Sequence, residues 1–213
     1  MNSWLLLAVL LPFVLADDCT KPTGKTCDAN VLSCCDNNLK SALGIDCRGK
    51  QTYDQPECLR RAIGGTYFNG STGAYQFCDG YNEFRNCLGP TTQSCTTTEY
   101  FIESGRVPEL AAFDEGMYAR LNFMCGAGLE TWLRNYDDDF NVKQSDLDRC
   151  ASTFENSVHR NKKKACEYLK DFASCYQLSF ADIPEMSWFI CELARVSGAY
   201  LAPHCDLTCT ASF

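Results

Sequence analysis

The sequence predicts an all-α protein, a disulfide-rich helical bundle built from two related cysteine-rich halves. Sixteen of its 213 residues are cysteines, close to the density that is typical of a disulfide scaffold. Apolar residues recur at steps of three and four over most of the chain, whereas alternating runs of strand length are scarce. The cysteine spacing of residues 35–87 also returns in residues 125–175.

The chain starts with an apolar segment that is typical of a signal peptide. Trp4 to Leu15 are almost purely apolar, but twelve residues of helix reach only about 18 Å, well short of a bilayer core of about 30 Å. Val14 and Ala16 place small residues at the usual cleavage positions. We therefore expect a signal peptide over residues 1–16, a secreted extracellular product and no membrane span.

The first cysteine-rich unit is expected over residues 17–105. One helix is predicted to end near Gly44 and another at Gly89-Pro90, because glycine and proline commonly terminate helices. Their apolar stripes are Leu32, Cys35, Leu39 and Leu43, and Tyr75, Cys78, Tyr81, Phe84, Cys87 and Leu88.

The second unit is expected over residues 106–213, packed with the first as one compact body. A long helix is predicted from Pro108 through Leu133, with a bend or close approach at Gly126 and Gly128. Its stripe comprises Leu110, Phe113, Met117, Leu121, Met124, Leu129, Trp132 and Leu133. Further helices are predicted from Ser145, which starts an apparent capping box with Asp148, around residues 166–176, and from Pro184.

The cysteines support both the repeat and the helices. Cys35-x22-Cys58-x19-Cys78-x8-Cys87 corresponds to Cys125-x24-Cys150-x15-Cys166-x8-Cys175. Cysteines nine apart lie on roughly opposite faces of a helix, so the members of each Cys-x8-Cys pair should have different partners, as should Cys34 and Cys35. All sixteen are expected in disulfides, without a predicted connectivity: Cys19, Cys27, Cys34, Cys35, Cys47, Cys58, Cys78, Cys87, Cys95, Cys125, Cys150, Cys166, Cys175, Cys191, Cys205 and Cys209.

Charge and surface motifs narrow the possible partners. The net charge of −8 disfavours nucleic acid as a partner, because binding to phosphates needs clustered positive charge. The one basic run, Arg160 to Lys164, is interpreted as a solvated turn. Asn69 begins the sequon Asn69-Gly70-Ser71 and is the predicted glycosylation site.

The sequence offers no convincing catalytic group, metal site or cofactor site. A histidine-dependent triad would need one of its two histidines, but His159 is interpreted as a solvated residue at a helix end and His204 as part of the C-terminal tail. Cys34-Cys35-Asp36-Asn37-Asn38 resembles secreted phospholipases A2, but the histidine of that motif is absent. No Cys-x-x-Cys pair is present, and Asp137-Asp138-Asp139 is interpreted as a solvated loop rather than a calcium site. We therefore expect a protein that is not an enzyme.

The aromatic residues leave two interpretations open. Phe68, Tyr75, Phe77, Tyr81 and Phe84 cluster within seventeen residues, and Trp188 is next to Phe189. Most should be core, but some are candidates for an exposed binding patch or for the lining of an apolar cavity.

The cysteine pattern carries a family resemblance over roughly residues 27–205. Cys78-x8-Cys87 with Phe84, and Cys166-x8-Cys175 with Phe172, resemble the secreted nematode-type cysteine-rich helical domain family known as domain of unknown function nineteen. A looser similarity is to the helical cysteine-rich repeats of glial-derived-type growth-factor co-receptors, which implies extracellular protein recognition. Neither family implies a functional residue in this chain.

The leading functional hypothesis is a secreted, non-enzymatic module that binds an extracellular protein. The alternative is a carrier of lipid or another small apolar ligand. A degenerate hydrolase of the phospholipase A2 type is the third hypothesis.

Overall fold

The computed structural model describes residues 18–136 and 140–210, with side chains of 140–144 left out. Over these residues every regular element is helical and no strand occurs, so the all-α, disulfide-rich prediction is confirmed. The predicted signal peptide, residues 1–16, and the whole acidic run Asp137-Asp138-Asp139 lie outside the described residues.

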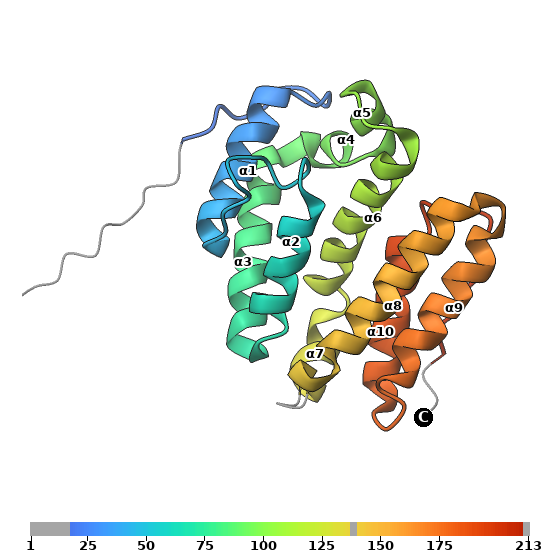
Figure 1. Ribbon diagram of the computed structural model, residues 1–213. Coiled ribbons are helices and arrows are strands. Elements are labelled where there is room, and N and C mark those ends of the chain that lie inside the picture. The colour runs from blue at the N-terminus through green and yellow to red at the C-terminus, as the bar shows by residue number, and fades with distance from the viewer. Residues whose placement is uncertain (1–17, 137–139, 211–213) are drawn as a thin grey trace, which may run out of the picture.

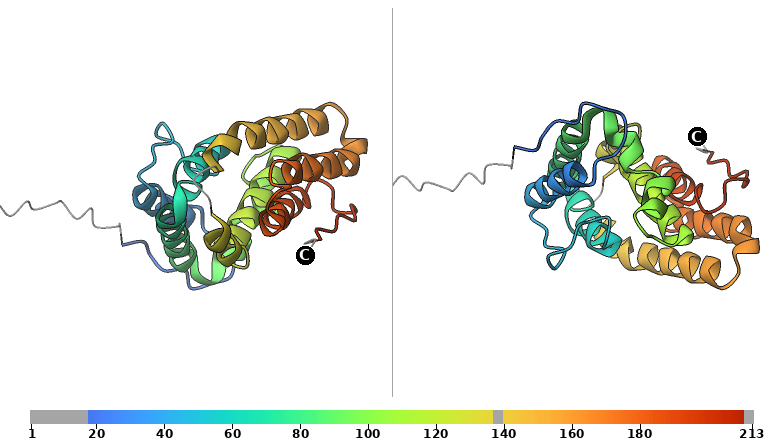
Figure 2. Two further views of the ribbon diagram at one scale, coloured as in Figure 1. Left: turned by 90° about the horizontal axis from the view of Figure 1, so that it is seen from below. Right: turned by 90° about the horizontal axis from the view of Figure 1, so that it is seen from above.

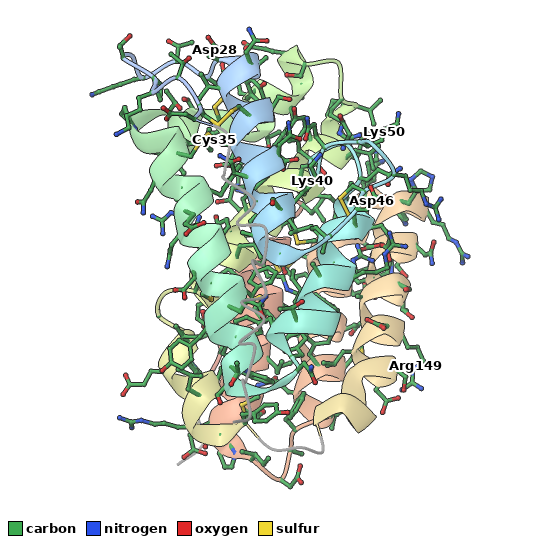
Figure 3. All side chains as sticks on the ribbon, turned by 90° about the vertical axis from the view of Figure 1, so that its left-hand side faces the viewer. Asp28, Cys35, Lys40, Asp46, Lys50 and Arg149 are labelled. Atoms are coloured by element: carbon green, nitrogen blue, oxygen red, sulfur yellow. A yellow bond between two sulfur atoms is a disulfide. The ribbon has the colours of Figure 1, made fainter. Side chains whose placement is uncertain are left out.

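The N-terminal elements form one side of the molecule (Figure 1). They are α1 (Ala29–Leu43), α2 (Pro56–Ala62), a π-helical turn (Ile63–Tyr67), α3 (Gly70–Leu88), a 3-10 turn (Gly89–Thr91), α4 (Thr92–Cys95) and α5 (Thr98–Glu103). The Asp28 carboxylate caps α1 by accepting from the Asn30 N–H at 2.8 Å; Figure 3 shows Asp28 at that end of the helix. The predicted ends at Gly44 and Gly89 are confirmed.

The C-terminal elements are α6 (Pro108–Met124), α7 (Leu129–Asn135), α8 (Phe140–Arg160), a 3-10 turn (Lys162–Lys164), α9 (Ala165–Leu178) and α10 (Pro184–Gly198). The continuous helix predicted through Leu133 is interrupted at Gly126 and Gly128, where a bend was expected. A Cβ on Gly128 would lie 2.8 Å from the Phe189 ring, so the glycine permits a close approach of α10. The predicted capping box at Ser145 is wrong, because α8 already begins at Phe140.

α6 runs between the N-terminal helices and the α8–α10 group, and α10 packs against α6, α7 and α9 (Figure 1). The α6–α10 contact depends on Gly116, where an added Cβ would lie 2.2 Å from the Ser197 carbonyl oxygen. One cluster of buried apolar side chains extends from α1 to α10. The two predicted units therefore share a core.

All sixteen cysteines form disulfides. The pairs are Cys19–Cys34, Cys27–Cys95, Cys35–Cys87, Cys47–Cys58, Cys78–Cys125, Cys150–Cys175, Cys166–Cys205 and Cys191–Cys209. The predicted separate partners for Cys34 and Cys35, and within each Cys-x8-Cys pair, are confirmed.

The disulfide pattern does not repeat between the halves. Cys35 pairs with Cys87, but their counterparts Cys125 and Cys175 pair with Cys78 and Cys150. The proposed relation between the two halves therefore finds no support in the connectivity. The Cys78–Cys125 bridge also joins the predicted first unit to the predicted second.

Candidate functional site

An apolar pocket of about 410 Å³ lies between α2, α6 and α8. Its walls are mainly apolar, with a charged margin, and its floor reaches α9 and α10. Its lining includes Glu57, Arg60, Leu110, Phe113, Met117, Arg120, Ala151, Phe154, Glu155, His159, Phe172 and Ser197. In both views of Figure 2, α8 runs along one side of the molecule and comes close to α2.

One wall comes from α6. Leu110, Phe113 and Met117 form part of the apolar stripe predicted for the helix that starts at Pro108, and they line the pocket. Leu110 is half exposed. The reason is that α6 is covered on other sides, where Ala111, Tyr118 and Leu121 are buried. A central helix needs more than one apolar face, so its stripe alone does not identify the face that is packed.

The opposite wall comes from α8 and α9. The Phe154 and Phe172 rings stack with centroids 4.8 Å apart, and the Phe113 ring of α6 lies edge-on to Phe154 with centroids 6.5 Å apart. Ala151, one turn before Phe154, also lines the pocket. Such stacked rings provide a rigid apolar surface.

An ion pair bridges the margin of the pocket from α2 to α8. The Arg60 guanidinium donates to the Glu155 carboxylate and lies 3.4 Å from Glu57 on its own helix. Arg60 therefore has two acidic partners within the protein.

Arg120 differs from Arg60 because no acidic residue in the described part of the chain pairs with it. Its Nε is a buried donor for which those residues provide no acceptor. The guanidinium lies beside the Tyr176 hydroxyl: burial raises the pKa of Tyr176, and the positive charge of Arg120 opposes that rise. Burial also raises the pKa of Tyr67, and the positive charge of Arg120 opposes that rise too. Arg120 therefore lines the pocket and acts electrostatically on two tyrosines from distant elements.

The predicted site residues are dispersed. His159 lies at the exposed margin of the pocket, whereas His204 is exposed in the C-terminal segment. Asn69 is exposed, as a glycosylation site requires, but it precedes α3 directly rather than lying in a long loop. The basic run is exposed around the 3-10 turn, and its Lys162 pairs with Glu109 of α6.

Most of the aromatic residues belong to the core. Phe68, Phe77, Tyr81, Phe84 and Phe189 are almost completely buried, whereas Tyr75 is 53% exposed. The sulfurs of Cys19, Cys35 and Cys87 lie within 4.8 Å of one another, but each belongs to a disulfide and is not a thiolate that could bind a metal.

Two aspartates are buried away from the pocket, and both have structural partners. Asp36, in the segment that resembles phospholipases A2, accepts hydrogen bonds from the Thr52 N–H and hydroxyl. Asp114 accepts from the Arg106 Nε at 2.8 Å. Burial raises the pKa of Asp114 to about 6, although the positive charge of Arg106 opposes the rise.

Asp114 should make stability depend on pH. Its carboxyl group has a higher pKa in the folded chain than its ordinary value of 3.8, so its contribution is fully present below about pH 4 and is lost as the pH rises through 6. Relative to Asp114→Asn, the wild type should gain about 1 kcal/mol of unfolding free energy between pH 7 and pH 5. Denaturant unfolding of both proteins at the two pH values measures this; an equal difference at both would contradict it.

No helix among the described residues is long and apolar enough to cross a membrane. No protein family, no curated protein and no solved structure matches the chain. The resemblance to the nematode-type domain family therefore stays a prediction.

Proposed function

We propose that the chain is an extracellular, disulfide-stabilised protein that binds and carries a small, mainly apolar molecule in the α2–α6–α8 pocket. Eight disulfides fit an extracellular protein, because they persist in oxidising compartments. The pocket is the main support for this proposal. Its volume of about 410 Å³ is within the usual range for small-molecule sites, and its mainly apolar lining contains a few polar groups.

We therefore prefer the carrier function to the protein-binding module, which was the leading hypothesis from the sequence. A protein interface needs a contiguous apolar patch with buried anchors. The large exposed apolar residues of the described chain instead come from several separate elements: Tyr75, Ile102, Val107, Leu110, Leu178 and Tyr200. Of these, Leu110 belongs to the pocket.

The proposed role contains no catalytic step. Ser197 lines the pocket and is a residue type that can act as a nucleophile, but its hydroxyl donates to the Leu193 and Ala194 carbonyls of its own helix. His159 is exposed at the margin. These features support binding rather than hydrolysis.

Filling the pocket tests the proposal. Ala151→Trp puts an indole between α8 and α2, and should weaken binding of the neutral fluorescent probe N-phenyl-1-naphthylamine by at least about tenfold, because the ring takes the space of the ligand. The neighbouring Ser152 is exposed and does not line the pocket, so Ser152→Trp is the matched control.

Fluorescence titration of the folded, secreted proteins gives the result. Binding that is lost in Ala151→Trp and kept in Ser152→Trp supports the carrier. No saturable binding to the wild type, or equal binding to all three proteins, would overturn it.

A further inference from the structure

Arg120 lines the pocket with a half-buried positive charge that no described acidic residue pairs with. The Arg60 guanidinium has Glu57 and Glu155 as partners, whereas none of the described acidic residues forms an ion pair with Arg120. An arginine is protonated at any physiological pH. A ligand that brings a negative group to Arg120 would therefore supply what the protein lacks.

The neighbours of Arg120 favour this arrangement. The pKa of Tyr176 is raised by burial, so its hydroxyl stays neutral and adds no negative charge. The Arg120 Nε is a buried donor without an acceptor among the described residues, and a buried unsatisfied donor is destabilising. An oxygen acceptor from the ligand would satisfy it.

The remaining surface favours an apolar chain next to this charge. Met117 lies three residues before Arg120 and Phe113 seven, so the three side chains share one side of α6. Phe154 and Phe172 face them from α8 and α9. Arg120 thus lies next to a mainly apolar part of the pocket lining.

From this charge arrangement we propose that the pocket binds an alkyl-chain carboxylate, a fatty-acid-like molecule whose head group pairs with Arg120 and whose chain lies against Phe113, Met117 and Phe154. A single guanidinium matches a singly charged carboxylate, because its planar fork can donate two parallel hydrogen bonds to the two oxygens. This inference rests on the proposed function, since it assigns the ligand of the same pocket.

Two probes with the same chain test the head group. Dodecanoate and dodecanol are each used, below the concentration at which they aggregate, to displace N-phenyl-1-naphthylamine from the wild-type protein. Dodecanoate should bind about ten- to a hundredfold more tightly, which is the effect expected of a hydrogen-bonded charge. This comparison does not depend on whether a variant folds.

Arg120→Met should then remove the preference, lowering dodecanoate affinity about ten- to a hundredfold while changing dodecanol affinity by less than about threefold. Arg149→Met is the matched control: Arg149 is 72% exposed, pairs with Asp146, points away from the rest of the molecule in Figure 3, and does not line this pocket. If Arg120→Met does not fold, Arg120→Lys keeps the charge and should keep part of the preference.

The outcomes separate the two proposals. Equal affinity of the wild type for dodecanoate and dodecanol would overturn the carboxylate assignment and leave the carrier intact. A preference that survives in Arg120→Met would likewise overturn the role of Arg120. If neither the naphthylamine probe nor either alkyl compound binds, the carrier function itself is wrong.

Discussion

Trp132→Ala is expected to lower the free energy of unfolding by about 3–5 kcal/mol, as for other fully buried large aromatic side chains. The Trp132 ring is completely buried. Its centroid lies 5.1 Å from Phe68, 5.4 Å from Tyr67 and 5.9 Å from Phe189. It thus connects the π-helical turn, α7 and α10, and its loss would leave a cavity where these three elements meet.

Guanidinium chloride unfolding with the disulfides intact measures this loss. Tyr75→Ala is the control, because Tyr75 is another aromatic residue but is 53% exposed, and its truncation should change stability by less than about 0.5 kcal/mol. A loss below about 1 kcal/mol for Trp132→Ala would show that this aromatic cluster contributes little to holding the elements together.

Replacing both Cys78 and Cys125 by Ala should lower the free energy of unfolding by about 4 kcal/mol. The bridge closes a loop with a sequence separation of 47 residues, and a cross-link of that length restricts the unfolded chain strongly. It is the disulfide that ties α3 to the residue directly after α6.

The Cys19–Cys34 bridge serves for comparison, because its sequence separation is only 15 residues. For a loop of that length, the restriction of the unfolded chain contributes about 3 kcal/mol to the free energy of unfolding. The double variant at Cys78 and Cys125 should therefore have the lower denaturant midpoint of the two. The reverse order would show that effects in the folded state, rather than loop length, decide the contribution of these bridges.

The sequence predicts the helices of this fold well where their periodicity and their terminating residues agree. α1 ends at Gly44 and α10 begins at Pro184 as expected, because these residues restrict the backbone locally. The start of α8 was wrong since Ser145-x-x-Asp148 has capping composition inside a helix that begins earlier. The π-helical turn and the disulfide connectivity depend on tertiary packing, which periodicity does not describe.

The pocket was less predictable than the fold. Phe113 and Met117 have the spacing of core residues, and only the position of α8 and α9 decides that they line a cavity. One signal was present in the sequence: Arg120 places a charge on the same side of the helix as Phe113 and Met117. A charge within an apolar stripe indicates either a buried ion pair or a polar ligand, and the fold is needed to distinguish the two.

The disulfides divide the chain into two separately cross-linked sets. Five bridges connect cysteines between residues 19 and 125, three connect cysteines between residues 150 and 209, and none joins one set to the other. A protease cut anywhere between residues 126 and 149 would thus release two fragments on a non-reducing gel. A cut after Gly105, by contrast, would leave a single band, because Cys78–Cys125 still joins the pieces.

The pocket lies between these two sets, with α2 and α6 in one and α8 and α9 in the other. Its walls are therefore joined by main chain and by noncovalent contacts, but by no covalent cross-link.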